Sequence, residues 1–250
     1  MKNKSVIITG ASRGIGEAAA RKFAQLGAKV LLCARTSDAI ETIAAEINAA
    51  GGTALALATD VADYDQVQAA IGLAQSEFGS VDILINNAGR LEPVERLEHA
   101  TVEAWDTIID VNVKGVFYGI RAALPIMKAE GGGTIITIGS GAATSALEGW
   151  SHYNTSKAAV HHLSACLHSE EGENGIRALV LSPGTVATQM QRIIKKSGVN
   201  PVSDLEWEDH RHPSVIADTL AWMCTPDADD FLGDVVRQSD PEILRCLGQK

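Results

Sequence analysis

A tyrosine and a lysine four positions apart are the residues of this chain best suited to acid–base chemistry. Tyr153 and Lys157 open a run that continues into Ala158-Ala159-Val160, and in a helix two residues at this spacing lie on one face, about one turn apart. A free tyrosine has a pKa of about 10, but a nearby cation favours the phenolate and lowers that pKa. The pair therefore predicts a general acid or base at neutral pH.

A serine precedes this pair and could share its chemistry. Ser140 follows the apolar run Ile135-Ile136-Thr137-Ile138, and its hydroxyl could hold a substrate oxygen between itself and the hydroxyl of Tyr153. A Tyr and a Lys four apart on a helix are also common as a packed ring and a solvated amine. The pair alone is therefore weak evidence, and the rest of the chain must decide.

The elements that would position these residues alternate along the chain. The strand-like runs are Ser5–Thr9, Lys29–Cys33, Thr53–Leu57, Val81–Ile85, Thr134–Ile138 and Arg177–Leu181. The helix-like stretches are Gly14–Leu26, Ser37–Ala50, Asp63–Phe78, Val102–Glu130 and Ser151–Glu171. Strands that are apolar throughout are covered on both faces, and this alternation implies parallel strands with right-handed crossovers. We expect an α/β fold, a doubly wound Rossmann-type parallel sheet flanked by helices on both faces, as a single domain of residues 1–250.

The first predicted strand ends in a glycine-rich turn that leads into a helix. The turn contains Gly10, Ser12, Arg13, Gly14, Ile15 and Gly16. Glycines allow a tight turn and a close approach of a pyrophosphate to the helix N-terminus, where unpaired N–H groups and the helix dipole favour an anion. Because a strand precedes the turn and an alanine-rich helix follows it, the turn indicates a dinucleotide site.

The end of the second predicted strand indicates which dinucleotide binds. An acidic residue there usually bonds the ribose 2′-hydroxyl of NAD, whereas an arginine accommodates the 2′-phosphate of NADP. This chain has Ala34 and then Arg35, and Arg13 is a second cation within reach. A carboxylate would repel the phosphate, so we expect NADP(H) to be preferred, with NAD(H) as the alternative if both arginines are only solvated surface charges.

Composition and charge exclude other classes of protein. The 250 residues carry a formal net charge of -10, whereas binding to a nucleic-acid backbone needs clustered Lys and Arg. Four cysteines are far apart and make no C-x-x-C pair, which is typical of free thiols in a reducing compartment. No long apolar segment precedes Val6 and no later stretch is long enough to span a membrane. We expect a cytoplasmic protein with no nucleic-acid or membrane partner.

With these residues in view, the chain resembles the short-chain dehydrogenase/reductase family over nearly its whole length, from about Ser5 to about Asp234. The pattern comprises Thr9-Gly10-x-x-x-Gly14-x-Gly16, Asp60-Val61, Asn86-Asn87-Ala88-Gly89, Asn112, Ser140, Tyr153-x-x-x-Lys157 and Pro183-Gly184. Each of these motifs alone is modest evidence for the resemblance, but their order and spacing together are highly specific for the family.

The resemblance implies a set of site residues. Tyr153 would be the catalytic acid/base, Ser140 would orient the substrate oxygen, and Lys157 would lower the pKa of Tyr153 and hold the nicotinamide ribose. Asn112 would anchor a water in a proton relay from Lys157. Further positions that the resemblance assigns to the cofactor are Asp60, Val61, Asn87, Ala88, Gly89, Pro183, Gly184, Val186 and Thr188. The implied reaction is hydride transfer between NADP(H) and a carbonyl or secondary alcohol, without a metal, and the implied assembly is a homo-oligomer, either dimer or tetramer, built through Val102–Glu130 and Ser151–Glu171.

The substrate is less well determined by the sequence. Ala142, Trp150, His152 and Met190 are candidate pocket residues, and we expect a segment of about 188–213 to close the pocket. Arg192, Lys195 and Lys196 would attract an anionic substrate if they face the pocket, although such a run is more often a solvated helix face. The tail from Gly233 to Pro241 departs from the family pattern.

Two other functions fit parts of the pattern. One is an NAD-dependent dehydrogenase of secondary alcohols. The other is a dinucleotide-binding protein without turnover, although such a protein has no chemical need for Asn112, Ser140, Tyr153 and Lys157 together. A metal site is not expected, because His161, His162 and His168 lack Cys or carboxylate partners at ligand spacing.

Overall fold

Seven parallel strands form one sheet in the computed structural model, which describes residues 1–248. The strands are β1 (Ser5–Thr9), β2 (Lys29–Ala34), β3 (Thr53–Ala58), β4 (Ile83–Asn86), β5 (Gly133–Ile138), β6 (Ile176–Ser182) and β7 (Val235–Arg237). Their order in the sheet is β3-β2-β1-β4-β5-β6-β7. Val6 of β1 is paired with Val30 of β2 on one side and with Ile83 of β4 on the other. The winding direction reverses between β1 and β4, and in such sheets ligands bind beyond the carboxyl ends of the strands at this point.

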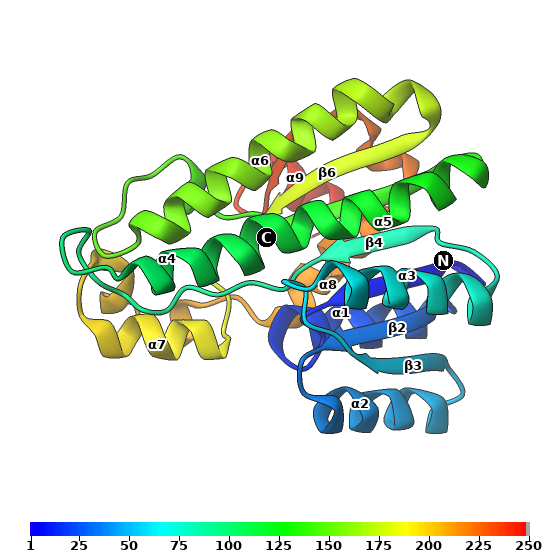
Figure 1. The fold of residues 1–250 in the computed structure, drawn as a ribbon, viewed down its shortest axis with the longest axis horizontal. Coiled ribbons are helices and arrows are strands. Elements are labelled where there is room, and N and C mark those ends of the chain that lie inside the picture. The colour runs from blue at the N-terminus through cyan, green and yellow to red at the C-terminus, as the bar shows by residue number, and fades with distance from the viewer. Residues whose placement is uncertain (249–250) are drawn as a thin grey trace.

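Helices cover both faces of the sheet (Figure 1). They are α1 (Gly14–Gln25), α2 (Ser37–Ala49), α3 (Tyr64–Phe78), α4 (Val102–Ile109), α5 (Gly115–Ala129), α6 (Ser151–Glu171), α7 (Gln189–Ser197), α8 (Pro213–Met223) and α9 (Pro241–Cys246). Helices α3, α5 and α6 pack against one face, whereas α1, α2, α8 and α9 pack against the other. The predicted doubly wound α/β fold is confirmed.

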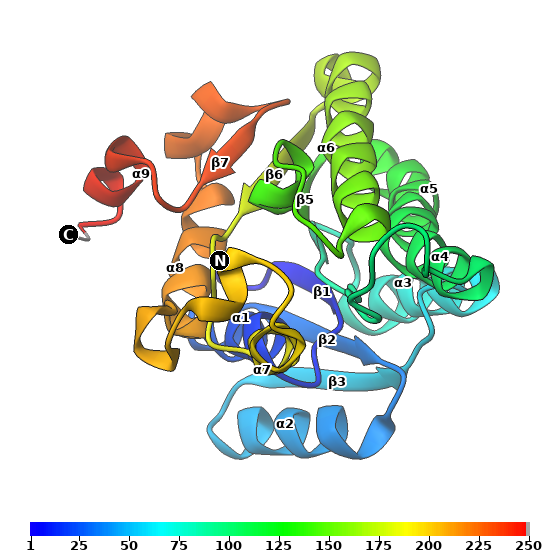
Figure 2. The ribbon, with the colours of Figure 1, turned by 90° about the vertical axis from the view of Figure 1, so that its left-hand side faces the viewer.

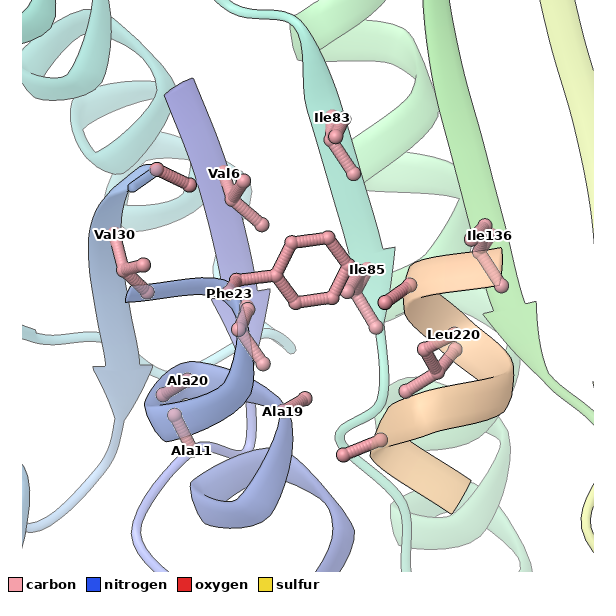
Figure 3. Close-up of a cluster of buried hydrophobic side chains, with 14 of the residues drawn as sticks. Val6, Ala11, Ala19, Ala20, Phe23, Val30, Ile83, Ile85, Ile136 and Leu220 are labelled. Atoms are coloured by element: carbon pink, nitrogen blue, oxygen red, sulfur yellow. The ribbon is translucent and has the colours of Figure 1, made fainter. Parts of the chain in front are cut away.

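The two faces explain why the strands are apolar throughout. Successive side chains of a strand point to opposite faces, and Val6 and Ile8 of β1 belong to the core beneath α1, whereas Ile7 belongs to the core beneath α5 and α6. Phe23 of α1 is fully buried beside the strands (Figure 3). Leu220 of α8 lies next to this group in the same core, so α8 covers the same face of the sheet as α1.

One predicted helix is interrupted in the structure. The helical stretch predicted at Val102–Glu130 consists of α4, a π-helical turn at Asp110–Lys114 and α5. Asn112 lies in the π turn and its side chain is bonded to Arg90 and Ser156 outside the helix. A π-helical turn of this kind is frequent at functional sites.

The last part of the chain supplies elements that the sequence did not indicate. Helix α7 occupies the first part of the segment expected to close the pocket, and Figure 2, which views the molecule from the end at which α7 lies, shows it in front of the strands. The atypical tail adds β7 beside β6, with Val180 paired to Val235. Asp240 then caps α9 by accepting from the N–H of Glu242 at 2.9 Å. No helix within residues 1–248 combines the length and the apolar composition needed to cross a membrane.

Candidate active site

A cavity of about 630 Å³ lies at the carboxyl ends of the strands. One end is lined by Arg13, Arg35 and Asp60, and the other by Ser140, Tyr153 and Lys157. Residues far apart in the sequence meet there because β1, β2, β4, β5 and β6 all end at the same edge of the sheet. The cavity connects the predicted dinucleotide turn with the predicted acid–base pair.

The glycine-rich turn has the geometry that a pyrophosphate requires. Gly10 and Gly14 have φ values of 65° and 60°, in the left-handed region that favours glycine. A Cβ on Gly10 would lie 2.8 Å from the Cα of Ala88, so no side chain fits there. The residue before α1, Arg13, makes no side-chain cap, which leaves the first N–H groups of α1 without a side-chain acceptor. This turn fits the pyrophosphate of a dinucleotide.

Not every predicted residue of the turn faces the cavity. Ser12 and Ile15 line it, whereas Gly16 is buried and does not. A Cβ on Gly16 would collide with the carbonyl oxygen of Gly10 and lie 2.9 Å from the Cα of Ala11. Gly16 therefore allows α1 to approach the turn closely, rather than providing a cavity-lining surface.

The loop after β4 is fixed to the end of β1. The Thr9 hydroxyl accepts from the N–H groups of Asn87 and Ala88, both at 3.0 Å. The Asn87 amide donates to the carbonyl oxygens of Thr9 and Gly10 at 2.8 and 3.0 Å. This loop and the glycine turn therefore form one rigid wall of the cavity, to which Asn87, Ala88 and Gly89 contribute.

The end of the cavity near β2 is cationic. Arg13 and Arg35 are exposed and line it, and within residues 1–248 neither arginine takes part in an ion pair. Ala34, where an NAD site usually has an acid, is buried and contributes no carboxylate. Asp60 and Val61 line the cavity after β3, and one carboxylate oxygen of Asp60 accepts from the N–H of Ala62 at 3.0 Å.

Tyr153 and Lys157 are both buried at the other end, with exposed fractions of 7% and 5%. The Lys157 Nζ atom lies 5.6 Å from the centroid of the Tyr153 ring and donates to the Ile138 carbonyl oxygen at 2.7 Å. Ser140 follows β5 by two residues, and its hydroxyl accepts from the N–H of Ala142 at 3.1 Å. Helix α6 and the end of β5 thus bring together the three residues that the sequence had singled out.

The pKa of Tyr153 differs from the sequence-based expectation. Burial raises it to about 12, and hydrogen bonding with Ser140 opposes this only in part. Burial also lowers the pKa of Lys157 to about 8, so the low-polarity surroundings disfavour both charged forms. The expected lowering of the Tyr153 pKa is wrong for this structure, because desolvation raises that pKa by more than the hydrogen bond with Ser140 lowers it.

Asn112 is tied to the loop that leads into the cavity. Its side-chain oxygen accepts from the N–H of Arg90 at 2.8 Å, and its amide donates to the Arg90 carbonyl oxygen at 2.8 Å. The same amide donates to Ser156 at 3.0 Å, and Ser156 donates to the carbonyl oxygen of Tyr153 at 2.8 Å. Asn112 therefore links the loop after β4 to the backbone of the helix that carries Tyr153.

Of the four predicted pocket residues, three line the cavity: Ala142, Trp150 and Met190. Trp150 packs edge-to-face on Tyr153 with ring centroids 5.6 Å apart. His152 is only 1% exposed and does not line the cavity. Its Nε2 bonds to the Pro93 carbonyl oxygen at 2.8 Å, and its Nδ1 accepts from the N–H of Tyr153 at 2.9 Å. These bonds place it behind the wall of the pocket, so we correct its assignment.

Several apolar side chains of the pocket were missed by the sequence analysis. Leu91, Leu147, Ile194 and Val202 line the cavity and form a small core with Ala142, Trp150, Tyr153 and Met190. Leu91 stands two residues after the Asn86-Asn87-Ala88-Gly89 motif, and this position could have indicated that Leu91 lines the cavity. Ile194 lies four residues after Met190 on α7. Residues at this spacing share one face of a helix, so the prediction of Met190 as a pocket residue could have been extended to Ile194.

The segment after β6 provides the remaining predicted residues. Pro183, Gly184, Val186 and Thr188 all line the cavity. The cations that follow face elsewhere: the Arg192 guanidinium stacks on Trp207 at 5.0 Å from the ring centroid, and the Lys195 ammonium is paired with Glu206 at 2.8 Å. Neither lines the cavity, so they offer no anion site within it.

Comparison with known proteins assigns the chain to a family. Residues 4–197 match the short chain dehydrogenase family. An uncharacterized oxidoreductase of Staphylococcus saprophyticus is 35% identical over 247 residues, which cover 98% of this chain and 99% of that protein. The protein belongs to the short-chain dehydrogenase/reductase family of oxidoreductases, whose members bind a nicotinamide dinucleotide.

Solved structures agree with this assignment. A 7α-hydroxysteroid dehydrogenase in complex with NADH and 7-oxo glycochenodeoxycholic acid is 31% identical, with a TM-score of 0.85, covering 94% of this chain and 92% of that one. A short-chain type dehydrogenase/reductase from Mycobacterium marinum is 34% identical, with a TM-score of 0.84 and 94% of both chains covered.

Proposed function

We propose that this protein is an NADP(H)-dependent oxidoreductase that interconverts a carbonyl compound and a secondary alcohol. The observation that carries the proposal is the cavity itself, which has the exposed Arg13 and Arg35 at one end and Tyr153 with Lys157 at the other. When bound, the dinucleotide supplies the hydride. The residues of the chain hold the substrate and supply the proton.

The role of Tyr153 is proton donation. In reduction the carbonyl carbon gains a hydride, and the carbonyl oxygen gains the phenolic proton of Tyr153. Because burial raises the pKa of Tyr153 to about 12, this phenol keeps its proton at neutral pH and is ready to act as a general acid. Ser140 holds the substrate oxygen beside it. At neutral pH the protonated phenol is the form of Tyr153 that reduction of a carbonyl requires.

Lys157 and Asn112 belong to the path by which Tyr153 regains a proton after it has donated one. Gly89 lies between them, since a Cβ there would be 3.5 Å from the Asn112 oxygen and 3.7 Å from Lys157 Nζ. We assign Lys157 to the nicotinamide ribose and to a proton relay in which Asn112 anchors a water. A buried ammonium costs several kcal/mol unless it is well compensated, so the buried Lys157 favours an enzyme over a protein that only binds a dinucleotide.

Cofactor preference is the finer part of the proposal. Arg13 and Arg35 are exposed and have no ion-pair partner among the described residues 1–248, so they fit a 2′-phosphate, and Ala34 leaves no carboxylate to bond a 2′-hydroxyl. The hydroxysteroid dehydrogenase mentioned above was solved with NADH, so NAD-dependent oxidation of a secondary alcohol is the competing function. The interpretation of Arg35 decides between them.

We further propose that the substrate is uncharged and apolar close to its carbonyl. The pocket is built from Leu91, Trp150, Ile194 and their apolar neighbours, while Arg192 and Lys195 are turned away. Arg90 and Glu92 also line the cavity, but their charges are opposite. A carboxylate placed among these apolar side chains would lose its hydration.

A matched pair of ketones tests this substrate class. We expect methyl 4-oxocyclohexanecarboxylate to be reduced with NADPH at a kcat/KM on the order of 100-fold above that of the free acid, because desolvating the carboxylate costs several kcal/mol. Met190→Lys should narrow this ratio by offering a cation. Equal kcat/KM values for the ester and the acid would contradict the proposed substrate class.

The assembly also remains a proposal. Val102 on α4 and Phe117 on α5 have exposed fractions of 70% and 46%, and members of this family often form oligomers. We expect a homo-oligomer, dimer or tetramer, in which the face formed by α4, α5 and α6 is covered.

A further inference from the structure

His161 lies one turn after Lys157 on α6 and contacts the backbone that carries Ser140. The N–H of Ser140 donates to His161 Nε2 at 3.3 Å. One turn earlier, Lys157 donates to the carbonyl oxygen of Ile138 at 2.7 Å. Two side chains of α6 therefore hold the backbone on either side of Gly139.

Gly139 makes this arrangement possible. A Cβ at that position would collide with His161 Nε2 and would lie 2.6 Å from a methyl group of Val180. The imidazole thus lies against bare backbone where β5 ends, and Ser140 begins the turn that leads toward the pocket. The direction of the Ser140 side chain depends on this short segment, because its hydroxyl also accepts from the N–H of Ala142.

We propose that His161 is a positioning residue for the reaction, because its Nε2 accepts from the Ser140 N–H and thereby fixes the Ser140 hydroxyl against Tyr153. His161 does not line the cavity, so it acts through Ser140 and touches neither substrate nor cofactor. This inference rests on the proposed reductase function, in which Ser140 holds the substrate oxygen.

The electrostatic surroundings suit an accepting imidazole. Burial lowers the pKa of His161 to about 4, and the charged groups that face the ring, Lys157 on its own helix and Arg237 on β7, add to this effect. The ring is therefore neutral at pH 7, with its proton on Nδ1 and a free lone pair on Nε2. Protonation of Nε2 would abolish the contact with Ser140.

Two amide substitutions separate this role from helix packing. Gln can place an acceptor near the position of Nε2, whereas Asn is one methylene too short to do so. We expect kcat for ketone reduction to fall about tenfold or more in His161→Asn, because small misplacements of a site group are costly, and to stay within about threefold of wild type in His161→Gln. The Kd for NADPH should change less than twofold in both. His162→Gln, at the exposed neighbouring position, is the matched control.

Hydrogen exchange of the Ser140 amide gives a readout that does not need turnover. It should be fast in His161→Asn and protected in wild type and His161→Gln. Equal kcat and equal Ser140 protection in His161→Asn and wild type would overturn the proposal, as would equal losses of kcat in the Asn and Gln variants. His161→Ala replaces the Asn variant if that protein does not fold. A wild-type protein without reductase activity but with the predicted exchange pattern would refute the proposed function and leave the contact with Ser140 established.

The burial of His161 and its cationic neighbours predict a pH dependence of stability. The pKa of His161 is about 4 in the folded chain and 6.5 ordinarily, so between these values the unfolded chain binds a proton that the folded chain does not. Stability contributed by this site therefore falls as the pH is lowered from 6.5 to 4. We expect Tm to fall less over this range in His161→Gln than in wild type and His162→Gln. Identical slopes in all three proteins would contradict a neutral, accepting His161.

Discussion

Replacing Tyr153 by phenylalanine should lower kcat for ketone reduction by roughly a thousandfold, since loss of a general acid typically costs 10²- to 10⁴-fold. The ring keeps its edge-to-face packing on Trp150, so only the proton donor is lost. Because the hydroxyl is hydrogen-bonded with Ser140, its removal should lower the free energy of unfolding by only about 1 kcal/mol, and the variant should still fold. NADPH should still bind with a Kd within a fewfold of wild type, as measured by calorimetry beside steady-state kinetics.

The control for this variant is Tyr118→Phe. Tyr118 packs edge-to-face on Tyr64, with centroids 5.4 Å apart, and does not line the cavity. It should retain wild-type kcat. Turnover by Tyr153→Phe at the wild-type rate would show that another group delivers the proton, and loss of NADPH binding in this variant would show that its effect is not confined to proton transfer.

Reversing the charge of Arg35 should change which dinucleotide is used. Arg35→Glu removes one cation from the proposed phosphate site and adds a carboxylate, so we expect Kd for NADPH to rise by about 10- to 100-fold, as for the loss of a hydrogen bond between charged groups. NADH carries no 2′-phosphate, and its Kd should change less than threefold. The ratio of the two kcat/KM values measures the preference directly.

Arg245→Glu makes the same change in charge on α9, where the residue is exposed and outside the cavity. It should leave both Kd values unchanged. If Arg35→Glu weakens NADPH and NADH equally, Arg35 does not contact the 2′-phosphate, and the NAD-dependent function becomes the better interpretation.

The sequence predicted the scaffold well where local signals were strong. The bounds of β1 (Ser5–Thr9) and α6 (Ser151–Glu171) were predicted without error, because an apolar run stops at a glycine turn in one case and a long helical stretch ends before a glycine-containing turn in the other. The local sequence pattern at Val102–Glu130 predicted a helix but not the π turn at Asn112. Its side-chain partner Arg90 is 22 residues away, and that contact exists only in the folded chain.

The candidate active site was also predicted only in part from the sequence. Spacing alone placed Tyr153 and Lys157 together, but it predicted the wrong direction for the pKa of Tyr153. Desolvation depends on what packs around the ring, and residues of the same cluster such as Leu91 and Ile194 are far from Tyr153 in the sequence. His152 was assigned to the pocket because it adjoins Tyr153, whereas the direction of its side chain is set by Pro93, a residue 59 positions earlier.

Deuterium transfer tests the central claim most directly. Wild-type protein would be incubated with NADPH deuterated at C4 and methyl 4-oxocyclohexanecarboxylate, and the alcohol product examined by mass spectrometry and NMR. With the transferred position of NADPH labelled, we predict one deuterium on the carbinol carbon, formed much more slowly by Tyr153→Phe. If NADPH labelled at either face of C4 is bound but no deuterium enters a product from this or any other uncharged apolar ketone, the chain is not the reductase proposed here.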